Sequence, residues 1–441
     1  MVDTRIDINR YDFSFWIIIA YIFFEFGRPQ DWVPILGSLH IPMVLQILCF
    51  LTLITRLPKR LPKQAILIFL FLLIMAKSVP FALNKYFAFK GTQFFAYMFF
   101  GSILPMMVLI NSYPKTNRLI RTWILVVIFV AVTGLVKGRG SGGFFGDEND
   151  FALLLNISIP FSFFLLFGER SKLWKILWIS SIGIFILANA SSLSRGGFLG
   201  LVSVGLYCWL KSKHKVKATL VFAMAIVLML SFAPERYWDE LKTIRTSTEK
   251  GDTGGERLYF WKLAWRMLLD NPIMGVGAGN FGMNPDAYMT AEEKEERGEL
   301  WGGGHYWGRV CHSTYFTILA EEGLPGAIVF LLIVYAFFKD MNRVIKFYVR
   351  KRKKEASELE VRVEKMHYLA LGAKGSMVGF LATGAFLTVI YYPVFWTLIA
   401  MSVFIKNTFE ETILELSLEE NRIEEREEVA CLEAFTPTII R

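Results

Sequence analysis

The sequence HSTYFTILAEEGLPG, residues 312–326, follows a long polar stretch and directly precedes an apolar run. The apolar run, residues 327–338, is expected to carry a helix that begins at His312 into a lipid bilayer. His312 would then lie at the water boundary, beside the helix N-terminus. The positive end of the helix dipole disfavours imidazolium there, so we expect a neutral imidazole that can act as a base.

The composition predicts a membrane protein. Of 441 residues, 54% are hydrophobic and 15% are aromatic, which is more than ordinary soluble proteins contain. The formal net charge of +9 is typical of nucleic-acid-binding proteins, but a polytopic membrane protein also gathers Lys and Arg in its cytoplasmic loops. We therefore expect these basic residues to contact membrane lipids, and we expect no nucleic-acid partner.

The cysteines and the N-terminus indicate no redox or metal chemistry and no cleaved leader. The four cysteines are scattered without a CxxC pair, and two of them lie inside apolar runs. The opening residues MVDTRIDINR lack a signal-peptide pattern, so the first apolar run is expected to remain as an anchor.

The apolar runs predict an all-α polytopic protein with about twelve transmembrane helices, since about 20 residues make one crossing. The runs lie near residues 12–27, 41–55, 65–83, 91–110, 119–136, 151–168, 173–190, 196–210, 216–233, 313–338, 367–390 and 392–406.

The short loops predict the orientation, because Lys and Arg accumulate on the cytoplasmic side. Every second loop is basic, and the loops between hold only isolated cations. An even number of crossings then places both termini in the cytoplasm. The basic loops contain Arg56, Lys59, Arg60 and Lys63; Lys115, Arg118 and Arg121; Arg170, Lys172 and Lys175; Lys211, Lys213, Lys215 and Lys217; and the segment 339–365.

Four regions follow from this pattern. Residues 1–233 would hold transmembrane helices 1–9, residues 312–406 helices 10–12, and residues 407–441 an acidic cytoplasmic tail. Residues 234–311 would form an extracytoplasmic loop, which is far longer than a connection needs to be and is therefore expected to be functional. Within this loop ERLYFWKLAWRMLLD, residues 256–270, predicts an amphipathic helix with one face formed by Trp261, Ala264, Trp265 and Leu268.

Two outer-face segments contain further candidate residues. In SSLSRGGFLG, Ser194 is a plausible N-cap, and Arg195 together with the helix-start amides would form a site for a diphosphate. The glycine-rich segment KGRGSGGFFGDEND, residues 137–150, leads into a helix, and we expect Asp147 and Asn149 to cap that helix.

Two patterns are not expected to carry chemistry. GAGNFG, residues 277–282, matches a dinucleotide-binding fingerprint but follows no strand and has no acidic residue placed to read a ribose, so we interpret it as a turn. His305 and His312 lack a third ligand and therefore do not indicate a zinc site.

An ordered set of segments resembles the O-antigen ligase superfamily. The set comprises Lys90, the glycine loop with Asn149, Ser-Arg-Gly-Gly at Arg195, the Arg257 helix followed by its glycine turn, and His312 with Gly323-x-x-Gly326. Ala327 and Val329 replace the Thr-x-Leu that often follows in that family. The segment FFEFGRPQDWVPILG is similar to the exosortase-associated branch, presumed O-glycosylation ligases.

The resemblance implies the C-type membrane glycosyltransferase architecture and an inverting, metal-independent reaction without a cofactor. It implies that His312 accepts the proton of an acceptor hydroxyl and that cations bind the diphosphate of a polyprenyl (undecaprenyl) diphosphate glycan donor: Arg195, Arg257, Arg139 and Lys90. Asn149, Glu321 and Tyr315 would support the site. The acceptor would be lipid A-core or protein, at the periplasmic face of the bacterial inner membrane.

Two alternatives remain at this stage. A glycan polymerase would use the same donor but lengthen a glycan. A transporter or flippase would be expected to show repeated halves and charges within broken helices near the bilayer midplane, whereas the notable cations here lie at helix ends and in one long loop.

Overall fold

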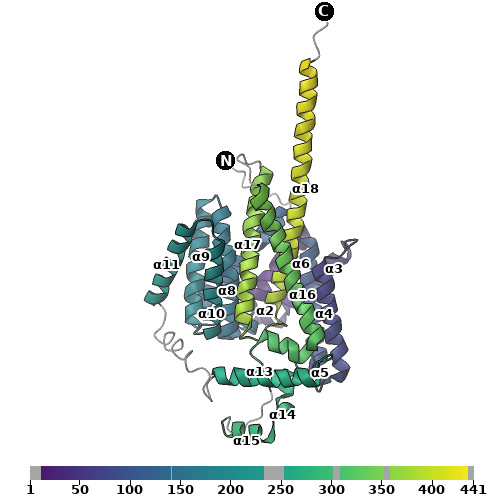
Figure 1. Ribbon diagram of the computed structural model, residues 1–441, viewed down its shortest axis with the longest axis vertical. Coiled ribbons are helices and arrows are strands. Elements are labelled where there is room, and N and C mark those ends of the chain that lie inside the picture. The colour runs from purple at the N-terminus through teal and green to yellow at the C-terminus, as the bar shows by residue number, and fades with distance from the viewer. Residues whose placement is uncertain (1–10, 141, 233–252, 301–307, 352–357, 436–441) are drawn as a thin grey trace, which may run out of the picture.

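A computed structural model describes residues 11–140, 142–232, 253–300, 308–351 and 358–435, and each regular element among them is a helix (Figure 1). The first half contains α1 Phe13–Ile22, η2 Phe23–Gly27, η3 Pro29–Asp31, α2 Pro34–Ser38, α3 Ile41–Ile54, α4 Lys63–Ser78, η4 Val79–Phe81, α5 Lys85–Met98, η5 Phe99–Ile103, α6 Leu104–Leu109, α7 Tyr113–Gly134, η6 Gly143–Gly146, α8 Glu148–Gly168, α9 Lys172–Ser191 and α10 Arg195–Lys211. The second half contains α11 Lys215–Phe232, α13 Thr253–Asp270, η8 Phe281–Met283, α14 Pro285–Tyr288, α15 Ala291–Leu300, α16 Thr314–Lys351, α17 Glu358–Gly384 and α18 Pro393–Phe435.

Six of these helices are long and apolar enough to cross a membrane, which confirms a polytopic α-helical membrane protein. They are Lys63–Phe81, Lys85–Leu109, Tyr113–Gly134, Glu148–Gly168, Lys172–Ser191 and Thr314–Val349. Each of the other expected runs also overlaps a helix of the structure, but the total of twelve crossings stays a prediction.

Helix α8 lies at the centre of the bundle, with nearly all its side chains buried. Its neighbour α17 approaches closely because three glycines of α17 face α8 and α10. A Cβ atom on Gly372 would lie 2.8 Å from Phe161, one on Gly375 would lie 2.7 Å from Pro160, and one on Gly379 would lie 2.7 Å from Val204. Small residues at helix interfaces allow this close packing where lipid supplies no hydrophobic driving force.

A buried polar network joins the helices that carry the outer-face segments. The Asn156 amide on α8 donates to the Gly197 carbonyl of α10 (2.9 Å) and accepts from the Asn189 amide of α9 (3.0 Å). It also donates to the Thr383 hydroxyl of α17 (3.2 Å). Because buried amides need partners, this network holds the start of α10 in register with α8 and α9.

The His312 segment differs from the single straight helix expected from the sequence. Helix α16 is broken at Gly323, where φ is 65° and ψ is −165°. Only glycine adopts this conformation readily, and the Leu324 amide there donates to the Pro272 carbonyl (2.8 Å). As one straight helix, 38 residues would span about 57 Å, well beyond a ~30 Å hydrocarbon core, so the break separates a short helix that follows His312 from a membrane helix.

The long loop lies at one end of the bundle. Helix α13 crosses this end, with α14 and α15 beyond it, whereas α18 projects from the opposite end (Figure 1). The buried face of α13 is formed by Tyr259, Phe260, Leu263, Ala264, Met267 and Leu268. The expected face is therefore wrong for Trp265, which is 49% exposed. The buried face of the helix is centred instead on the side that contains Phe260 and Leu263.

We expect cysteine labelling to place α14 on the extracytoplasmic side of the membrane and the α10–α11 loop on the cytoplasmic side. In a chain whose four native cysteines are replaced, a membrane-impermeant thiol reagent applied to intact cells should label Ala287→Cys and not Lys213→Cys; both positions are exposed. Permeabilised cells, where both should react, are the control. Labelling of position 213 alone would reverse the orientation and place His312 in the cytoplasm.

Candidate active site

The candidate site is a cavity of about 510 Å³ between the bundle and α13. Three parts of the chain form its walls: the α7–α8 loop, the α9–α10 connection, and the start of α13 together with His312. The lining residues are Lys137, Gly138, Arg139, Asp147, Glu148, Asn149, Ser191, Ser192, Leu193, Ser194, Arg195, Glu256, Arg257 and His312. Residues separated by up to 175 positions thus meet at one cavity.

The structure brings together five of the eight residues predicted for the site: His312, Arg195, Arg257, Arg139 and Asn149. Lys90 does not line this cavity. It lies on α5, where its ammonium donates to the Gln93 amide oxygen (3.2 Å) and lies 6.0 Å from the Tyr86 ring centroid.

Two capping residues hold the starts of α8 and α10 against each other. Asp147 accepts from the Asn149 backbone N–H (2.8 Å), and Ser194 accepts from the Gly197 backbone N–H (2.9 Å). The Ser194 hydroxyl also donates to the Asn149 side-chain oxygen (2.7 Å). Asp147 and Ser194 are therefore the caps expected from the sequence. The expectation that Asn149 is also a cap is wrong, because it lies inside α8, where its side chain connects the two caps.

His312 has a strained backbone. Its φ is 52°, and Leu193 on the facing wall has a φ of 57°, a left-handed conformation that is uncommon for residues other than glycine. Helix α16 begins two residues after the histidine, and the Ser313 hydroxyl accepts from the Phe316 backbone N–H (3.5 Å). Strain of this kind is often found where a side chain must point at a ligand.

The surroundings of His312 favour the neutral imidazole. Burial lowers the pKa of His312 below its ordinary value, and the Arg257 and Arg309 guanidinium groups lower it further. Asp147 and Glu256 act in the opposite direction. Because desolvation and nearby positive charge both penalise imidazolium, His312 is available as a proton acceptor near neutral pH.

Aromatic stacking fixes α13 over the site. The Trp261 ring stacks on Phe316, one turn after His312, with centroids 5.2 Å apart and an interplanar angle of 14°. Since Arg257 is one turn before Trp261, this stack holds Arg257 and His312 on one side of the cavity.

Glu321 and Tyr315 support the site from outside the cavity. The Glu321 carboxylate accepts from the backbone N–H groups of Gly279 (2.9 Å) and Phe281 (2.8 Å) and from the Tyr391 hydroxyl (2.7 Å). It thereby fixes the GAGNFG segment, which is a turn, as interpreted from the sequence. The Tyr315 hydroxyl donates to the Leu381 carbonyl (2.6 Å) and joins α16 to α17.

We expect Glu321→Gln to lower the free energy of unfolding by about 2 kcal/mol, because one of the two carboxylate oxygens that accept backbone N–H groups becomes an amide donor. Thermal unfolding in detergent measures the change as a lower Tm. Glu295→Gln, an exposed acid of α15, is the matched control and should melt like the parent. An unchanged Tm for Glu321→Gln would mean that the turn does not depend on this carboxylate.

Sequence reasoning missed Lys137 and Glu256 as cavity residues. Each lies at the start of a segment singled out from the sequence, residues 137–150 and 256–270, but a charged residue at such a position carries no signal of the direction in which its side chain points. His305 lies outside the described residues. Among the described residues, no group of three or more His, Cys, Asp or Glu side chains converges as metal ligands, and metal independence stays a prediction.

The fold and this cavity define a polytopic helical membrane protein with a cationic, histidine-containing site at one end of its bundle. Residues 176–331 match the sequence model of the O-antigen ligase family, and this range includes Arg195, Arg257 and His312. The resemblance to the O-antigen ligase superfamily is thereby confirmed.

One curated protein supports the same conclusion. The chain is 23% identical over 271 residues to a Rickettsia conorii protein named "Putative polysaccharide ligase". The aligned region covers 57% of this chain and 62% of that protein. The chain therefore spans less than two thirds of the length of this relative.

Proposed function

We propose that this chain is a membrane glycosyltransferase that moves a glycan from a polyprenyl diphosphate donor to an acceptor hydroxyl at the extracytoplasmic face. The observation that carries the proposal is the meeting of His312, Arg195 and Arg257 at one cavity, within the region that matches the O-antigen ligase family. Lipid A-core or a protein would supply the acceptor hydroxyl in a bacterial inner membrane.

The proposed reaction makes use of the charged residues of the cavity. The acceptor oxygen attacks the anomeric carbon while the bond from that carbon to the diphosphate oxygen breaks, and the diphosphate leaves with the bonding electrons. His312 accepts the hydroxyl proton. A single displacement inverts the anomeric configuration.

The cations would act on the leaving group. A departing diphosphate gains negative charge, and Arg195, Arg257 and Arg139 approach the cavity from three different segments. Guanidinium groups form two parallel hydrogen bonds with phosphate oxygens, so they stabilise this charge with defined geometry. Lys90, placed on α5, would attract the anionic donor without touching the reacting diphosphate.

The test is turnover by the purified full-length chain with a synthetic polyprenyl diphosphate glycan, an acceptor, and a chelator. We expect a glycosylated acceptor with inverted anomeric configuration and a rate that the chelator does not change. Glycan chains that lengthen without acceptor would identify the polymerase alternative instead. Absence of any transfer by a chain that binds the donor would contradict both enzymatic functions.

A further inference from the structure

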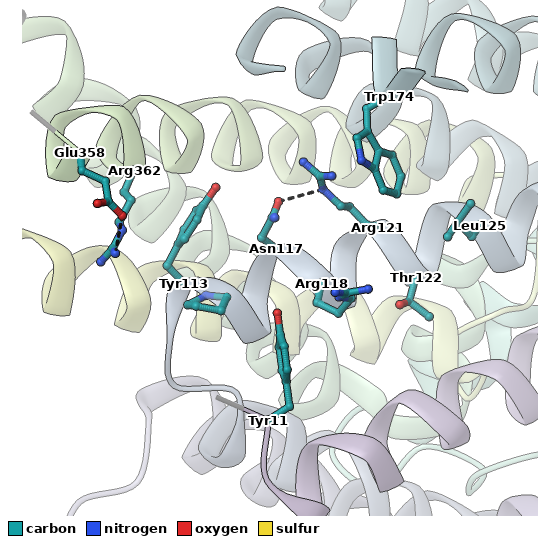
Figure 2. Close-up of a pocket in the computed structure, with 11 residues that line it drawn as sticks. Tyr11, Tyr113, Asn117, Arg118, Arg121, Thr122, Leu125, Trp174, Glu358 and Arg362 are labelled. Carbon is teal, nitrogen blue, oxygen red and sulfur yellow. Dashed lines mark hydrogen bonds and ion pairs between the residues drawn. The ribbon is translucent and has the colours of Figure 1, made fainter. Parts of the chain in front are cut away.

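A second cavity, of about 360 Å³, lies at the end of the bundle opposite the candidate active site. Figure 2 shows its lining: residues of the N-terminal part of α7, Tyr11 before α1, Trp174 on α9, and the start of α17. Helix α7 runs 22 residues, about 33 Å, from this cavity to the glycine loop of the active site. The two cavities therefore cannot share one head group.

Two of the three arginines in this cavity are held by carboxylates. Arg121 donates to Glu169 (2.6 Å) and lies 4.3 Å from the Trp174 ring centroid. Arg362 donates to Glu358 (2.9 Å). Arg121 forms a rigid wall, because a guanidinium that is both paired and stacked has little rotational freedom, and Arg362 is neutralised by its carboxylate partner.

The third arginine, Arg118, has no carboxylate partner in the described part of the chain. Its guanidinium carbon lies 5.6 Å from the Tyr11 ring centroid, and this cation–π contact leaves its N–H donors available. The cavity thus has an uncompensated positive charge, which an anionic ligand would neutralise.

Tyr113 adds an unused hydrogen-bonding group. Its hydroxyl is buried and has no hydrogen-bond partner among the described residues. In Figure 2 its ring lies between the Arg362 and Asn117 side chains. Because an unsatisfied buried hydroxyl is costly, this hydroxyl is available to form a hydrogen bond with a ligand that enters the cavity.

The cavity has a charged end, at Arg118, and an apolar end, at Leu125. Leu125 lines it two turns, about 10 Å, along α7 from Arg118. Tyr11, Tyr113 and Trp174 stand where a transmembrane segment begins, as aromatic residues do at the membrane boundary. A free phosphate ion would use only the charged end, whereas a phospholipid matches both ends.

We propose that this cavity binds the phosphodiester head group of an anionic membrane lipid, held by Arg118 and the Tyr113 hydroxyl, with the start of an acyl chain along Leu125. The lipid would connect the segment before α1 with α7, α9 and α17. It would stabilise the folded bundle, because it binds the folded chain and not the unfolded one. Basic loops on this side would enrich anionic lipids nearby.

The test compares phosphatidylglycerol, phosphatidylcholine and inorganic phosphate as ligands of the full chain in neutral detergent, by Tm and by native mass spectrometry. We expect phosphatidylglycerol alone to raise the Tm. Arg118→Gln should weaken phosphatidylglycerol binding about tenfold, the loss of one charge-assisted interaction. Arg60→Gln, an exposed arginine of the α3–α4 loop outside the cavity, is the matched control and should bind like the parent.

Tyr113→Phe separates ligand binding from folding. Removal of a hydroxyl without a partner should leave the Tm without lipid unchanged or higher, yet reduce the shift that phosphatidylglycerol causes. An equal Tm shift with inorganic phosphate would identify a soluble anion as the ligand and overturn the lipid. Parent-like phosphatidylglycerol binding by both Arg118→Gln and Tyr113→Phe would overturn the site.

Discussion

In His312→Ala, glycan transfer is expected to fall by about 10²- to 10⁴-fold, the usual contribution of a general base, while donor binding stays near that of the parent. The imidazole acts on the acceptor hydroxyl, and the arginines on the diphosphate. Turnover and donor affinity are measured separately on purified protein. A variant that binds donor and turns over at the parent rate would remove His312 from the mechanism.

Two variants distinguish loss of the catalytic base from disruption of the backbone conformation at position 312. His312→Asn has a side chain that tolerates the left-handed backbone of this position, where φ is 52°, but provides no base. It should be as inactive as His312→Ala while melting like the parent. Tyr315→Phe, which loses only the bond to Leu381 outside the cavity, should retain most of the activity.

The pH profile provides a further readout of the same residue. Burial and Arg257 lower the pKa of His312, so the neutral base persists below the ordinary titration range of histidine. We expect kcat/KM to be constant above about pH 6.5 and to fall only as the pH decreases further and imidazolium forms. A fall that begins above this range would contradict a buried, neutral His312.

In Arg257→Lys and Arg195→Lys, we expect the rate to fall by about tenfold or more although the charge is kept. A lysine ammonium is a point charge and cannot replace two parallel hydrogen bonds from one planar group to a phosphate. Turnover is measured with a synthetic lipid diphosphate donor for both Lys variants and both Ala variants.

Two controls make this comparison specific. Lys90→Ala removes a cation at the same end of the molecule but outside the cavity, and should reduce the rate only weakly. Arg343→Lys alters an exposed arginine paired with Glu410 at a distance from the site, and should act like the parent. If both Lys variants at 195 and 257 keep parent rates while the Ala variants recover at lower salt, the cations only attract anionic lipid, and the proposed role at the diphosphate is wrong.

Much of the site was predictable because its residues stand at helix starts with local sequence signals. Ser194 followed by Arg195-Gly-Gly specifies a capped helix start, and the glycine loop that ends in Asp147 specifies another. These signals need only the few neighbouring residues that make the hydrogen bonds. They do not specify which helix starts meet.

The sequence by itself determined that this protein is helical and embedded in a membrane, because long apolar runs require a helix to satisfy every backbone group in lipid. Only the tertiary structure decided that Arg139, Arg195, Arg257 and His312 share one cavity and that Lys90 does not. The break at Gly323 likewise depends on Pro272, 51 residues earlier, whose carbonyl accepts the Leu324 amide. Local patterns cannot contain such contacts, since they depend on the packing of distant segments.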